Sequence, residues 1–218
     1  MRKVGIVAGI GTVLAVSACG SGARQDASEP SGKFRVAVST ASFPSSQTLS
    51  EHTHLRIAVH NSSTKTIPDV AVTICNVTCA YPAPKGEGTS AAAFSADLNQ
   101  SGLANPSRPI WVVERGPGAC KYSCRNGGAG AAVTAYSNTW ALGALHPGKT
   151  VSFDWTVTAV ARGHHVVAWE VAAGLNGKAR AVLANGSRPQ GTFPVEISSK
   201  PAQSYVDNNG QIVQGSGR

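Results

Sequence analysis

The sequence has few charged and few aromatic side chains, and it lacks any segment of ten or more residues with helical spacing of apolar positions. Charged residues make up 14% of the 218 positions and aromatic residues 6%, whereas glycine and proline number 24 and 12. This composition excludes a coiled coil, a collagen and a highly charged disordered chain. The single methionine, Met1, excludes a thioether copper site. The length and the 42% of hydrophobic residues suit one domain with one core.

A long apolar run is also missing beyond the start of the chain, so no later segment is expected to span a membrane. The start itself has a basic segment (1–3), an apolar segment (4–16) and then Ser17-Ala18-Cys19. This order is typical of an export signal. Its end resembles the lipobox of bacterial lipoproteins, which implies that Cys19 is acylated and becomes the mature N-terminus. The alternative is an ordinary signal peptide with a chance cysteine.

The chain is therefore expected to be extracytoplasmic and lipid-anchored to the cell membrane. We predict a lipoprotein signal peptide at 1–18 and a flexible tether at 19–33, because the residues before 33 are small, polar and without apolar period. A β-sandwich domain is expected at 34–200, with an insertion at 75–137, and a C-terminal tail at 201–218.

Strict alternation of apolar and polar residues recurs along the chain from residue 34. Alternation of this kind, with β-branched and aromatic residues, predicts half-buried antiparallel strands. Turn residues such as Pro147-Gly148, Asn176-Gly177 and Asn185-Gly186 separate them. The fold class predicted is all-β, an immunoglobulin-like antiparallel sandwich of about seven to nine strands. The alternating apolar sets are Phe34/Val36/Val38, Leu55/Ile57/Val59, Val70/Val72/Ile74, Val151/Phe153/Trp155/Val157, His165/Val167/Trp169/Val171, Ala181/Leu183 and Phe193/Val195/Ile197.

Two motifs resemble bacterial immunoglobulin-like modules of the CARDB (cell-adhesion-related) type. One is a strand, an Asn-small turn and a second strand, from Leu55 through Asn61-Ser62-Ser63 to Val72; the other is the Leu-x-Pro-Gly turn at 145–148 and its following strand. Residues 140–197 also look like uncharacterised envelope proteins of actinobacteria. The resemblance implies a binding or scaffolding module and transfers no catalytic residue.

The insertion at 75–137 is longer than a sandwich loop needs, and a structureless loop of that length is unusual. Residues 110–113 are expected to form one more strand, and residues 131–136 another. The remainder predicts an elaborated loop end, which is where function usually resides.

Four cysteines lie in the insertion as two C-x3-C pairs: Cys75/Cys79 and Cys120/Cys124. In an exported protein an even number of cysteines predicts disulfides, with three pairings open. Local pairing needs a tight turn, because positions i and i+4 of a strand lie about 13 Å apart. The matched spacing therefore favours cross-pairing that staples two loops. The alternative is a tetrathiolate zinc site or a thiol-redox centre.

Histidines and carboxylates show no converging set. His52, His54 and His60 share one strand face, and the alternation that buries Leu55 places them on the outer face. No close carboxylate pair, nucleophile elbow, dinucleotide motif or P-loop is present. We expect neither an enzyme nor a cofactor nor a metal.

Four cations of the insertion form a candidate site for an anionic ligand: Arg108, Arg115, Lys121 and Arg125. They could bind an anionic cell-wall polymer, lipid headgroups or another envelope protein. A nucleic acid is not expected, because the protein is exported and its cations are sparse. The function predicted is a membrane-anchored, non-enzymatic binding or scaffolding module; the alternative is a metal-binding or thiol-redox protein that uses the four cysteines.

Overall fold

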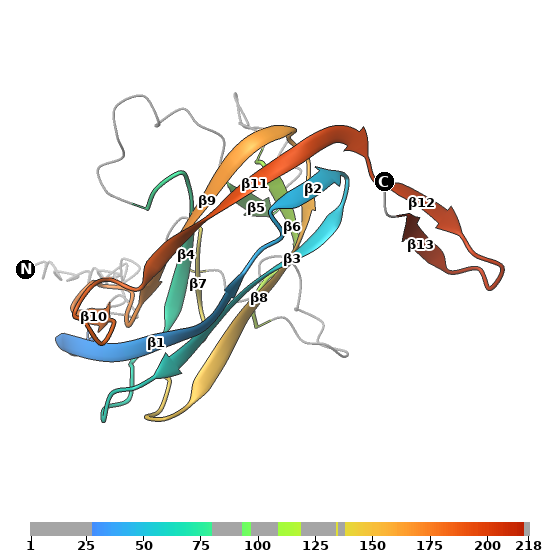
Figure 1. The fold of residues 1–218 in the computed structure, drawn as a ribbon. Helices are drawn as coiled ribbons and strands as arrows, with labels where there is room; N and C mark the ends of the chain where they lie inside the picture. Colours follow the sequence, from blue (N-terminus) through green and yellow to red (C-terminus); the bar gives the residue numbers. More distant parts are fainter. Residues whose placement is uncertain (1–27, 80–92, 97–108, 119–133, 135–137, 216–218) are drawn as a thin grey trace, which may run out of the picture.

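Two β-sheets packed face to face make up most of the computed structural model (Figure 1), which describes residues 28–79, 93–96, 109–118, 134 and 138–215. The predicted all-β, immunoglobulin-like sandwich is confirmed, since every regular element in those residues is a strand. Within the described residues, no helix is long and apolar enough to cross a membrane.

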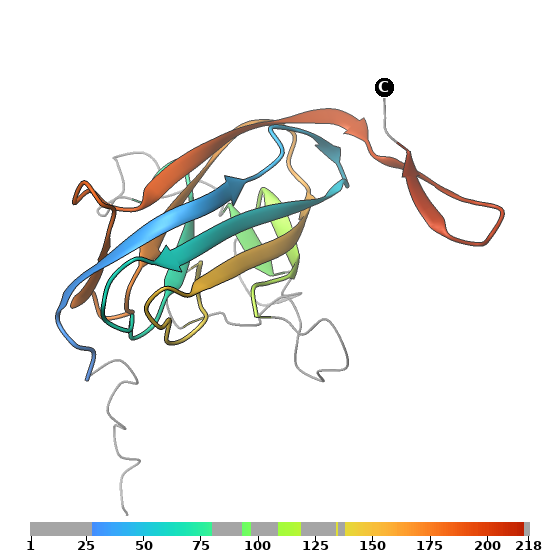
Figure 2. The same cartoon turned by 60° about the horizontal axis from the view of Figure 1, so that its bottom comes forward.

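The two sheets draw their strands from all parts of the chain (Figures 1 and 2). The six-stranded sheet has the order β10 (Ala179–Val182), β1 (Gly32–Ser42), β3 (His52–Asn61), β8 (Thr150–Ala159), β6 (Trp111–Arg115) and β5 (Phe94–Ala96). The five-stranded sheet has the order β2 (Ser46–Leu49), β11 (Gln190–Pro201), β9 (Gly163–Ala172), β4 (Ala71–Asn76) and β7 (Thr139–Ala141).

Both sheets contain parallel as well as antiparallel strand pairs, whereas the sequence predicted an antiparallel sandwich. The central pairs β1–β3, β3–β8, β9–β11 and β4–β9 are antiparallel. Parallel pairs occur at the edges, where β10 joins β1, β2 joins β11 and β5 joins β6. A period of two residues indicates which side chains face inward, but it carries no information on the direction of the neighbouring strand.

The insertion contributes two of these strands. The strand expected at 110–113 is observed as β6, and β5 pairs with it although no strand was predicted there. The further strand expected at 131–136 lies outside the described residues except for Thr134.

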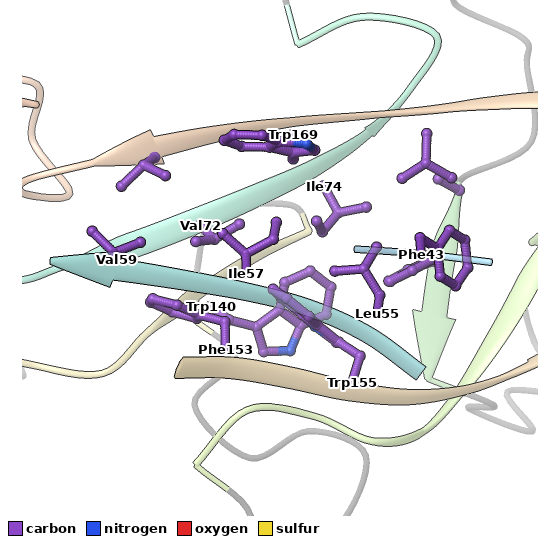
Figure 3. Close-up of a cluster of buried hydrophobic side chains, with 14 of the residues drawn as sticks. Phe43, Leu55, Ile57, Val59, Val72, Ile74, Trp140, Phe153, Trp155 and Trp169 are labelled. Carbon is purple, nitrogen blue, oxygen red and sulfur yellow. The ribbon is translucent and has the colours of Figure 1, made fainter. Parts of the chain in front are cut away.

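Aromatic rings fill the space between the sheets (Figure 3). The fully buried Trp155 of β8 stacks on Phe153, with ring centroids 6.0 Å apart, and meets the edge of Trp140 at 5.5 Å. Burying such a side chain contributes about 1.5–3 kcal/mol, and each aromatic pair adds roughly 0.5–1.5 kcal/mol. These rings explain how a chain with few aromatic residues builds a sandwich core.

Asn61 is fully buried and explains the Asn-small turn of the CARDB-like motif. Its side-chain amide donates to the carbonyl oxygens of Lys65 and Leu145, and its Oδ1 accepts hydrogen bonds from the backbone and hydroxyl of Ser63. The side chain thus satisfies all its polar atoms while it ties the β3–β4 turn to the segment before β8.

Contacts between the start of the chain and the sandwich are present from Glu29. β1 starts at Gly32, and the Glu29 carboxylate accepts hydrogen bonds of 2.6 Å from the backbone N–H groups of Asn176 and Ala179. Glu29 therefore holds the chain against the β9–β10 turn before the first strand starts.

The predicted tail at 201–218 contains a hairpin of β12 (Gln203–Val206) and β13 (Ile212–Gly215). Asp207 Oδ1 accepts from the backbone N–H groups of Asn209 and Gln211 and so closes the turn. The hairpin stands away from the sandwich, at the end opposite to the start of β1 (Figures 1 and 2).

Candidate binding groove beside the Cys75–Cys79 loop

A tight turn follows β4 and closes a small disulfide loop. The Thr78 backbone N–H donates to the Asn76 carbonyl over 2.7 Å, and the residue between them, Val77, has φ of 65°. This geometry is a γ-turn with a positive φ, which is rare for any residue and strained for a β-branched one. It brings the Cα atoms of Cys75 and Cys79 to 5.2 Å, and the two residues form a disulfide.

Cross-pairing of the cysteines was therefore a wrong prediction for this pair. The expected obstacle, about 13 Å between positions i and i+4, holds only for an extended chain. Here the chain leaves the strand after Asn76 and reverses at Val77, which allows the local pairing. Cys120 and Cys124 lie outside the described residues, and their disulfide stays a prediction.

The tetrathiolate zinc alternative is overturned by the same bond, because it requires Cys75 and Cys79 as thiolates. Among the described residues no group of three or more His, Cys, Asp or Glu side chains could hold a metal ion. The thiol-redox version of the alternative stays a prediction.

Next to this loop a groove of about 410 Å³ runs over the outer face of the five-stranded sheet. We call it the Val77 groove. Ala168 of β9 pairs with Cys75 of β4 on one side and with Thr192 of β11 on the other, so these three residues share the outer face. The side chains of Ala168 and Thr192 are small, so they leave the bottom of the groove unfilled. The lining residues are Val77, Thr78, Cys79, Ala168, Trp169, Glu170, Arg188, Gln190, Gly191 and Thr192.

The walls of the Val77 groove differ in chemistry. Val77, one of the two exposed large hydrophobic residues in the described chain, has 44% of its surface accessible. Farther along, Arg188 Nη1 lies 3.6 Å from the Glu170 carboxylate, with both side chains partly exposed. An ion pair of this exposure contributes little to stability and can be exchanged for pairs with a ligand.

Gly191 of β11 leaves room for the ring of Trp169 on the core side of the sheet, behind the groove. A Cβ atom at this position would lie 2.7 Å from Cζ2 of Trp169. Trp169 is itself buried, with 7% of its surface exposed. Only glycine therefore allows the indole to lie across β11 at this point.

The histidines lie where alternation placed them, on the outer face of the other sheet. His52 and His54 are exposed, and His60 is half-buried. They contact threonines of the neighbouring strand rather than one another: His52, His54 and His60 meet Thr158, Thr156 and Thr150. His52 also pairs with Glu114 of β6. They do not converge on one site.

Of the four cations predicted as an anionic-ligand site, the structure describes one. Arg115 is exposed on β6, and its guanidinium donates to the Thr156 hydroxyl at 3.0 Å. Arg108, Lys121 and Arg125 lie outside the described residues, as does the proposed lipidation residue Cys19. The cation cluster and the lipidation stay predictions.

The groove was missed because it joins three strands that are distant in the sequence. Cys75 was singled out for its pairing, and Gly191 was not singled out at all. A local signal existed in the sequence: a C-x3-C pair directly after an alternating strand could have indicated a closed turn at its end.

No family model and no curated protein matches the sequence. Similar solved structures include the CARDB domain of a Pyrococcus furiosus protein in complex with di-metal ions (12% identity, 78% of this chain and 92% of that chain, TM-score 0.37). Another is native α2-macroglobulin from Escherichia coli, from domain MG7 to the C-terminus (9% identity, 82% of this chain and 21% of that chain, TM-score 0.38). A third is the ASH/PapD-like domain 7 of human CEP192 (13% identity, 80% and 89%, TM-score 0.35). These similarities concern the fold alone.

Proposed function

We propose that this chain is a lipoprotein held on the outer side of the cell membrane through Cys19, and that it acts as a non-enzymatic binding module. The observation that carries the binding role is the Val77 groove, where a disulfide-closed turn displays an apolar side chain beside an exchangeable ion pair. Residues held in strained conformations by their surroundings are found preferentially at ligand clamps and active sites.

The disulfide between Cys75 and Cys79 supports an extracytoplasmic location. Disulfides persist in oxidising environments and are rare in cytosolic proteins. The basic start, the apolar segment and Cys19 agree with the same location.

The shape of the Val77 groove favours an extended partner over a small substrate. The groove is open and lies on a sheet face, whereas small-molecule sites usually enclose most of their ligand. An extended segment of another envelope protein could lie on the small side chains, contact Val77 and pair with Arg188 or Glu170.

Anchoring is tested by the intact mass of the full chain purified from a bacterial host, together with its Cys19→Ala variant. We expect a mature N-terminus at Cys19, acyl mass on that residue, and loss of membrane association in the variant. Retention of the variant on membranes after export, or a mature Cys19 without acyl groups, would contradict the anchor.

The binding face is tested by placing a photo-crosslinking amino acid at Val77 in the full chain on intact cells. The matched control carries the same residue at Arg56, which is exposed on the outer face of the six-stranded sheet. We expect a discrete crosslinked species from position 77 alone, and its loss when Arg188→Glu is added. Equal products from both positions, or none from position 77, would contradict the groove as the binding face.

A further inference from the structure

Cations gather at the end of the sandwich where β1 begins. β1 and β10 are parallel neighbours, and their register places Lys33 directly beside Arg180. Phe34 and Ala181, which follow them, are buried, so the two cations point outward from the sheet. Two residues farther along β1, Arg35 lies exposed on the same face. Further exposed cations of this end are Lys65, Lys149 and Lys178.

Among the described residues, no acid neutralises Lys33, Arg35 or Arg180. No described carboxylate lies within ion-pair distance of Lys33, Arg35 or Arg180. The nearby Glu29 directs its carboxylate to the backbone N–H groups of Asn176 and Ala179. Like charges on paired residues of a sheet repel each other. The fold therefore keeps positive charge here at a cost that an anionic ligand would offset.

Two shallow hollows flank Lys33, so the surface has concave sites as well as positive charge. One, of about 410 Å³, lies between Lys33, Arg35 and the hydroxyl-bearing turn Ser62–Thr64. The other, of about 450 Å³, lies between Lys33, Lys178 and Arg180. A group that carries a phosphate and hydroxyls can meet cations and hydroxyl side chains together in such a hollow.

The position of this end relative to Cys19 indicates what it faces. Glu29 is held on the domain, so only residues 20–28 separate it from Cys19. Fully extended, the chain from Cys19 to Glu29 spans at most about 36 Å. If Cys19 is acylated, as the proposed function requires, the β1–β10 end lies next to the membrane. The β12–β13 hairpin then lies at the far end (Figure 2).

We propose that the surface formed by Lys33, Arg35 and Arg180 binds anionic phospholipid headgroups and so orients the domain on the membrane. The inference rests on the proposed lipid anchor for its geometry. Each cation near an anionic surface strengthens association by about fivefold, and salt screens the attraction over roughly 10 Å at 0.1 M. The domain then stands on its β1–β10 end, with the Val77 groove on its side.

The test is lysine labelling of the full chain reconstituted into vesicles of phosphatidylcholine alone or with phosphatidylglycerol. Labelling with a neutral acylating reagent is read by mass spectrometry at Lys33 and, as an internal reference at the far end of β11, at Lys200. We expect Lys33 to react at least about fivefold more slowly on the anionic vesicles, with Lys200 unchanged. High salt should abolish the difference.

A matched pair of variants separates this surface from charge in general. Arg35→Gln with Arg180→Gln should remove the protection of Lys33. Arg56→Gln with Arg162→Gln, which deletes the same charge elsewhere, should leave that protection intact. Equal labelling on both vesicles, protection that survives in the first variant, or protection by isolated cell wall but not by anionic vesicles would overturn the inference.

Intact mass of the same preparation reports separately on the anchor. Acylated Cys19 without protection of Lys33 would overturn the headgroup surface and leave the anchor in place. Protection of Lys33 on a chain without acyl groups would support the surface and contradict the anchor.

Discussion

Where β3 and β8 meet on the outer face of the six-stranded sheet, polar side chains bind one another, whereas beside Ala168 of β9 the outer face of the five-stranded sheet has small side chains and a groove. β3 and β8 pair Arg56 with Asp154 and His60 with Thr150. β9 and β11 instead place Ala168 opposite Thr192, beside the exposed Val77. The polar groups between β3 and β8 are already paired and offer little to a protein partner. The comparison therefore directs the search for binding to the Val77 groove.

The largest effect is expected from Gly191→Val, which acts on the core side of the sheet behind the groove. The new side chain would collide with the buried ring of Trp169, because a Cβ atom alone would lie 2.7 Å from it. We expect a loss of about 2 kcal/mol in the free energy of unfolding, measured in urea by tryptophan fluorescence. The control is Thr192→Val, one position along and facing outward, which should be close to neutral. Equal effects would show that the buried ring of Trp169 does not require glycine at position 191.

Removal of the disulfide by Cys75→Ser with Cys79→Ser is expected to cost less, about 1 kcal/mol. Closure of so short a loop stabilises by about 2 kcal/mol in the chain-entropy model, and release of the strained Val77 offsets part of this. Reduction of the unmodified protein should reproduce the loss. A loss above about 3 kcal/mol would mean that the loop supports the core rather than the groove.

Val77→Gly should stabilise the protein slightly, by about 0.5 kcal/mol. Glycine removes the roughly 1–2 kcal/mol cost of a left-handed φ but restores chain entropy to the unfolded state. Val77→Ala retains the Cβ and should bring no gain. Higher stability combined with weaker partner binding would mark Val77 as a residue retained for function. Unchanged binding would remove it from the binding face.

The titration of Asp69 is expected to affect stability at the end of the sandwich, away from both faces. Burial raises the pKa of this carboxyl above its ordinary value of 3.8; the Gly143 N–H opposes the shift and the nearby Glu29 adds to it. The folded state thus holds the proton more tightly, so stability falls as pH rises from about that value through the raised pKa. Asp69→Asn should remove this fall in urea titrations between pH 3.5 and 6, whereas a stability that rises over this window would contradict the sign.

The smallest effect is expected on the paired face. The Asp154 carboxylate raises the pKa of the Arg56 guanidinium, but the pair is exposed to solvent. Such pairs contribute little to stability. Arg56→Gln should leave the urea midpoint unchanged at 0.5 M salt, and a clear loss would show that this face is more than a solvated surface.

Strands with long alternation could be predicted because the signal is local. β1, β3, β8, β9 and β11 each span ten residues or more, and the expected apolar sets face the core. β2, β5 and β7 are only three or four residues long, which is too short for a period of two to appear. Their places depend on partners elsewhere in the chain.

The buried polar residues show a similar division. Asn61 belonged to a recognisable motif, although one of its four hydrogen bonds reaches Leu145, 84 positions away. The buried Gln47 belongs to no recognisable sequence motif. It accepts a hydrogen bond from the Trp111 indole N–H at 2.7 Å, a contact between residues 64 positions apart.

The sequence by itself determined the all-β class, the inward face of the long strands and the outward position of the histidines. These follow from the alternation of side chains along each strand, which is a property of neighbouring residues. Only the tertiary structure decided the parallel edge pairs, the Val77 groove and the gathering of cations at β1 and β10. Each of these depends on which distant strands become neighbours, and that choice is made by packing the two inner faces into one core.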